Sequence, residues 1–114
     1  MSQILLSYQA SQEHYKEMDP KEEISKIILE KKKEYSVGEI HSYTHSTIVF
    51  ETFIGTPFNK WNSYLLIALT EKFKKHPFYF TVCKIFEGKG GMYFDYSNGD
   101  LEEDTKYVEK LKKL

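Results

Sequence analysis

The chain has 114 residues, 40 % of them hydrophobic and 16 % aromatic, so we expect one folded domain over residues 1–114 and exclude global disorder. No apolar run approaches the roughly 20 residues that a membrane span needs, and a net charge of −1 gives no bulk field to attract duplex DNA. All 16 basic residues are Lys, so any phosphate contact would use lysines, N–H groups, hydroxyls or His instead of bidentate arginines.

The first third of the chain indicates a strand followed by an amphipathic helix. Residues 3–10 contain three consecutive aliphatic residues, a run short enough for a strand that enters the core. Asp19 is a favoured helix N-cap, Pro20 suits the first helical position, and isoleucines then recur at helical spacing. We therefore predict a helix over residues 20–35.

The segment from Glu39 to Pro57 fits two patterns. Alternating side chains from Ile40 onward favour a strand, whereas after Ser46 the apolar residues fall on one side of a helix. Ser46 can cap the start of that helix and Gly55 can cap its end. We predict a short helix between these two caps.

Residues 57–69 leave two alternatives open. They form either a second helix capped by Thr56 or a connection that leads into a buried strand over residues 64–69. Residues 78–87 alternate between two sets of apolar and aromatic side chains, which predicts a strand.

The last third of the chain predicts a hairpin and then a helix. Residues 88–91, Gly-Lys-Gly-Gly, allow a tight turn and lack the spacing of a Walker phosphate loop, so residues 92–96 could pair back. Asp100 would cap a final amphipathic helix. Together these elements predict the α+β class, as a single small domain with a mixed β-sheet flanked by helices.

Single features give no specific metal or cofactor site. His41 and His45 could bind zinc from one helix, but in an extended segment their side chains would lie about 13 Å apart. No nearby carboxylate completes a known metal signature, so we predict no metal and no cofactor. The lone Cys83 excludes an internal disulfide and, without a signal-peptide pattern, favours the cytoplasm. The 17 Tyr and Phe residues could stack on bases, but we expect them to fill the core.

Three separated patches of the sequence occur in an informative order. They are Ser11 after the first strand, His45-Ser46-Thr47-Ile48 followed by Asn59-Lys60, and Lys84 followed by Glu87-Gly88-Lys89. This order resembles the viral ring nucleases, small anti-CRISPR proteins that destroy the second messenger cyclic tetra-adenylate. Lys60 and Lys84 stand where that family has arginines.

The resemblance implies a homodimer that binds cyclic tetra-adenylate at its interface. It implies that His45 is the catalytic residue and that the ring is held by Ser11, Lys60, Lys84, Glu87 and Lys89. Such cleavage needs no metal, because the 2′-hydroxyl of the substrate can attack while a His protonates the leaving 5′-oxygen.

The expected function is therefore a metal-independent ring nuclease that yields short linear adenylates and counters type III CRISPR signalling in the host cytoplasm. Two alternatives stay open: a sponge that holds a cyclic nucleotide without cleaving it, and a small phage or mobile-element inhibitor that binds a host protein.

Overall fold

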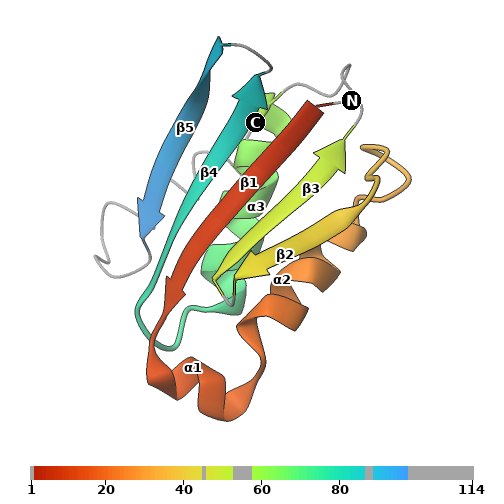
Figure 1. Ribbon diagram of the computed structural model, residues 1–114. Helices are drawn as coiled ribbons and strands as arrows, with labels where there is room; N and C mark the ends of the chain where they lie inside the picture. Colours follow the sequence, from red (N-terminus) through yellow and green to blue (C-terminus); the bar gives the residue numbers. More distant parts are fainter. Residues whose placement is uncertain (1, 45, 53–57, 87–88, 98–114) are drawn as a thin grey trace.

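A computed structural model of the chain describes residues 2–44, 46–52, 58–86 and 89–97, which form a five-stranded sheet with helices against it (Figure 1). The elements in chain order are β1 (Ser2–Ala10), α1 (Gln12–Glu17), α2 (Pro20–Leu29), β2 (Ile40–Thr44), β3 (Thr47–Thr52), α3 (Phe58–Lys72), β4 (Phe78–Phe86) and β5 (Lys89–Ser97). The predicted α+β class is confirmed.

The strands lie in the order β2-β3-β1-β4-β5, and every pairing among them is antiparallel. The expected mixed sheet is therefore wrong. Strands β1 and β2 do run parallel, but β3 folds back as a hairpin and inserts between them, so no parallel pair forms. The first four strands with α2 and α3 have the split βαβ arrangement of ferredoxin-like folds, and β5 extends the sheet at one edge.

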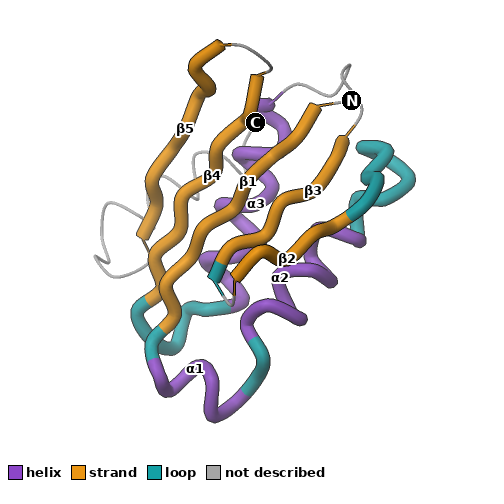
Figure 2. The backbone as a smooth tube through the Cα atoms, viewed as in Figure 1, coloured by secondary structure: helices purple, strands orange, loops and turns teal. Residues whose placement is uncertain are grey.

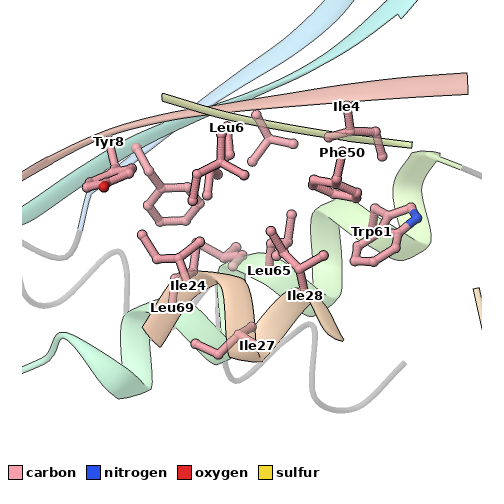
Figure 3. Packing of buried hydrophobic residues seen from close by; sticks show 14 of the residues in the cluster. Ile4, Leu6, Tyr8, Ile24, Ile27, Ile28, Phe50, Trp61, Leu65 and Leu69 are labelled. Carbon is pink, nitrogen blue, oxygen red and sulfur yellow. The ribbon is translucent and has the colours of Figure 1, made fainter. Parts of the chain in front are cut away.

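The core lies between the sheet and the pair α2 and α3, which cover one of its faces (Figure 2). In β1 the alternate residues Ile4, Leu6 and Tyr8 point toward the helices, as the period of two in a strand requires. Figure 3 shows these side chains packed against Ile24 and Ile28 of α2 and against residues of α3.

Helix α2 begins where the sequence predicts and ends earlier. The Asp19 side chain accepts a hydrogen bond from the Lys21 N–H at 3.1 Å, and Pro20 occupies the first position of the helix. The α-helix ends at Leu29 instead of residue 35, and residues 30–36 form turns. The run from residue 30 to 34 is entirely charged, so a longer helix would bury nothing more there.

The predicted helix between Ser46 and Gly55 is wrong, because residues 47–52 form strand β3. Ile48, Phe50 and Thr52 alternate along β3 and are all buried. The strand is hydrogen-bonded to neighbours on both sides, β1 and β2, and this pairing outweighs the local helical pattern. The predicted cap at Gly55 lies outside the described residues.

Of the two alternatives for residues 57–69, the helix is confirmed and the strand is wrong. Trp61, Leu65 and Leu69 recur every fourth residue of α3 and are fully buried. No helix in the described part of the chain is long and apolar enough to cross a membrane.

The C-terminal hairpin is confirmed as the pair β4 and β5. Strand β5 begins at Lys89, so Gly90 and Gly91 lie in the strand and not in the predicted turn. The short helix α1 was not predicted from the sequence. The predicted helix that starts at Asp100 falls beyond the described residues.

Candidate functional site

Ser11 directly follows β1 and joins two distant segments of the chain. Its N–H donates a hydrogen bond to the carbonyl of Pro77 at 3.3 Å, in the connection between α3 and β4. The hydroxyl oxygen of Ser11 is buried and makes no capping hydrogen bond to α1. Two hydrogen-bonding groups hold the pKa of the Glu13 carboxyl below its usual value. The larger contribution comes from the backbone N–H of Glu13 and the smaller from the Ser11 hydroxyl.

The turn between β2 and β3 lies at the same end of the sheet. The N–H of Tyr8 donates to the carbonyl of Ser46 at 3.0 Å, which ties the turn to the end of β1. Thr44 Oγ1 accepts a hydrogen bond from the Ser46 N–H at 3.2 Å, and the Ser42 hydroxyl donates to the Thr44 carbonyl at 3.2 Å. His45 itself lies outside the described residues. Because residues 47–52 form a strand, the helix that Ser46 was predicted to cap does not begin there.

A basic segment completes this end of the sheet. Lys74 and Lys75 are exposed in the connection that leads to β4, and the following His76 lies 3.5 Å from a carboxylate oxygen of Glu17. Strand β4 starts opposite the last residue of β1, because Phe78 pairs with Ala10. We call this end of the sheet the Ser11 end. It is defined by Ser11, Thr44, Ser46, Lys74, Lys75 and His76.

Sequence reasoning missed the two lysines of the Ser11 end. They precede the predicted strand 78–87, so antiparallel pairing of that strand with residues 3–10 would have placed them next to Ser11. The two lysines were visible in the sequence, but placing them near Ser11 required knowing which strand pairs with which.

Lys60 and Lys84 lie at the opposite end of the sheet. Lys84 pairs with Ile4, six residues before Ala10, which corresponds to roughly 20 Å along a strand. Lys60 is exposed in the first turn of α3, next to Trp61, whose indole N–H donates to Thr52 at the end of β3. Within one chain the structure therefore does not bring these lysines together with Ser11.

The structure does not place the two remaining predicted ligand residues, Lys89 and Glu87, near Ser11. Lys89 pairs with Phe86 at the start of β5, close in register to Lys84 and away from Ser11. Glu87 lies outside the described residues.

His14 is a buried structural residue beside the Ser11 end. Its Nε2 lies 2.9 Å from the carbonyl of His76, and its ring makes edge contacts with Phe73 and Phe78. Only 1 % of His14 is exposed, so it is closed to a ligand.

The chain matches no family model, no curated protein and no solved structure. The likeness to viral ring nucleases therefore depends on the three sequence patches alone.

Proposed function

We propose that the protein is a metal-independent ring nuclease that binds cyclic tetra-adenylate at the Ser11 end and cleaves it with His45 as general acid. The main support for this proposal is the hydrogen bond from the Tyr8 N–H to the Ser46 carbonyl. This bond holds Ser46, the residue after His45, against the end of β1. On the other side of β1 lies β4, which is preceded in the chain by Lys75 and Pro77.

The chemistry needs only groups that this end of the sheet can supply. The ribose 2′-hydroxyl attacks the adjacent phosphorus and loses its proton to solvent. The bond from phosphorus to the 5′-oxygen breaks, and the His45 imidazolium protonates that oxygen. The products are a 2′,3′-cyclic phosphate and a 5′-hydroxyl, and general-acid help of this kind contributes about 10²–10⁴-fold in rate.

Lys74 and Lys75 take the role that the resemblance gave to Lys60 and Lys84. Both are exposed, and they stand three and two residues before Pro77, whose carbonyl accepts a hydrogen bond from the Ser11 N–H. Their ammonium groups would neutralise ring phosphates, and the hydroxyls of Thr44 and Ser46 would add hydrogen bonds. Lys60 and Lys84 are left out of the proposed site because they lie at the far end of β1.

The direct test is incubation of the full chain with labelled cyclic tetra-adenylate in excess EDTA, with products separated by chromatography. We expect linear adenylates from the natural protein, and a rate at least about 100-fold lower from His45→Ala with binding retained. Equal rates for the two proteins would contradict the role of His45. Intact ligand recovered from a stable complex would instead identify a sponge.

A lysine exchange tests the location of the site. The double variant Lys74→Gln and Lys75→Gln should bind the ring at least about tenfold more weakly, because two phosphate contacts are lost. The matched control is another exposed adjacent pair, Lys32→Gln and Lys33→Gln, in the turns after α2. Equal weakening by both pairs would indicate only a general charge effect and would contradict the proposed location.

A further inference from the structure

Three metal-ligating side chains meet on the second face of the sheet, at its β2 edge. Ile40 and Phe50 pack toward the core, so alternation along the strands turns the neighbouring side chains away from it. These neighbours are Glu39, His41 and Glu51, and one ligand atom from each lies within 4.8 Å of the other two. The group is separate from the Ser11 end.

The backbone holds these residues in fixed register. The Glu51 N–H donates to the carbonyl of Glu39 at 3.0 Å, and the Gly38 N–H donates to the carbonyl of Glu51 at 2.8 Å. His41 is paired with Val49, the residue two before Glu51. Glu39, directly before β2, is therefore held opposite Glu51 of β3. Like charges placed opposite each other destabilise a sheet unless a cation lies between them.

We propose that Glu39, His41 and Glu51 bind one divalent transition-metal ion of the Zn²⁺ type. Two carboxylates neutralise the ion, and the imidazole favours zinc-like ions over Mg²⁺ or Ca²⁺. In a tetrahedral zinc site neighbouring ligand atoms lie about 3.3 Å apart, given metal–ligand bonds of about 2.0 Å. His41 Nε2 is already 3.2 Å from the Glu39 carboxylate. The Glu51 carboxylate oxygen would therefore need to move by at most about 1.5 Å toward the other two ligand atoms to complete a zinc site.

The side chains have the freedom to close around an ion. The Glu39 side chain is 77 % exposed and that of His41 is 45 % exposed, so changes of rotamer do not disturb the core. Three protein ligands leave a fourth position for water, which is the pattern of zinc sites that stay open to solvent. This proposal departs from the sequence-based expectation of no metal, because hairpin pairing brings Glu51, ten residues beyond His41 in the chain, close to it.

The test is calorimetric titration of the full chain with Zn²⁺ alone, after metal is removed with EDTA and the chelator is exchanged away. We expect one ion per chain, and at least tenfold weaker binding by each of Glu39→Gln, His41→Ala and Glu51→Gln. Co²⁺ should give a visible absorption band in the natural protein that His41→Ala loses, which reports nitrogen coordination directly.

The matched controls are Glu22→Gln, an exposed carboxylate on α2, and His76→Gln, an imidazole that lies 3.5 Å from a carboxylate oxygen of Glu17. Both controls should bind Zn²⁺ like the natural protein. Absence of binding, or binding that survives in Glu39→Gln and His41→Ala, would overturn the proposal. No nucleotide is present, so neither result depends on the proposed nuclease activity.

Discussion

At the scale of single residues, the fully buried Trp61 depends on one hydroxyl. Its indole N–H donates to Thr52 Oγ1 at 3.0 Å, and the Thr52 hydroxyl donates in turn to the carbonyl of Tyr35 at 2.8 Å. These bonds connect α3, the end of β3 and the turns after α2. A buried donor without a partner costs far more than an average hydrogen bond contributes, so Thr52 is a sensitive position.

Thr52→Val keeps the shape of the side chain and removes both bonds. We expect the free energy of unfolding to fall by about 2 kcal/mol, because the Trp61 N–H loses its partner inside the core. Urea denaturation followed by tryptophan fluorescence measures the change, since Trp61 is the single Trp of the chain.

Thr70→Val is the matched control. The Thr70 hydroxyl donates to the carbonyl of Leu66 at 2.6 Å within the same helix, and its loss should change stability by less than about 0.5 kcal/mol. A similar loss in both variants would contradict the special role of Thr52.

At the scale of elements, Tyr64 ties α3 to the last turn of α2. Its hydroxyl donates to the carbonyl of Ile27 at 2.6 Å and lies 3.1 Å from the Glu30 carboxylate. Ile27 is in the last turn of α2, where helix carbonyls lack partners within the helix. Tyr64→Phe should therefore lower the free energy of unfolding by about 1 kcal/mol at pH 7.

The same tyrosine predicts a dependence on alkaline pH. Burial, together with the nearby Glu30 carboxylate, raises the pKa of Tyr64 well above its usual value, and burial raises the pKa of Tyr8 to about 12. A raised pKa in the folded state means that the neutral phenol contributes stability below about pH 10, the pKa of an unfolded tyrosine, and that this stability is lost as pH rises further.

We therefore expect unfolding free energies measured between pH 10 and 12 to fall more steeply for the natural protein than for Tyr64→Phe. Tyr79→Phe, which removes an exposed hydroxyl from β4, should keep the slope of the natural protein. Equal slopes for the natural protein and Tyr64→Phe would contradict the coupling.

The elements that sequence reasoning found are those with strong local signals. Asp19 and Pro20 mark the start of α2, and alternation marks β4. The prediction for residues 47–52 was wrong because the spacing of the apolar residues after Ser46 fits one side of a helix, although Val49 and Phe50 have strand propensity. Pairing with the two neighbouring strands decides between the two.

The candidate site was predictable in part. Ser11 could be placed after a strand, but its neighbours could not, because they come from the β2–β3 turn and from residues 74–77. Which strands pair, and in which register, depends on the whole sheet. For the same reason the sequence analysis did not place Glu51 near His41, because that contact depends on the pairing of β2 with β3.

At the scale of the whole molecule, we propose that the nuclease acts as a homodimer. A cyclic tetranucleotide has two-fold symmetry, so two Ser11 ends facing each other across a two-fold axis would match it. We expect native mass spectrometry of the complex with His45→Ala to give two chains per ring. One ring for each single chain would contradict the dimeric site.

The proposed nuclease site is tested most directly by locating the bound nucleotide on the molecule. We would add cyclic tetra-adenylate to uniformly ¹⁵N-labelled His45→Ala in EDTA and follow the backbone amide signals. We predict that the largest shifts occur at Ser11, Ser46 and Lys75. Largest shifts at Lys60 and Lys84, or no shifts at saturating ligand, would contradict it.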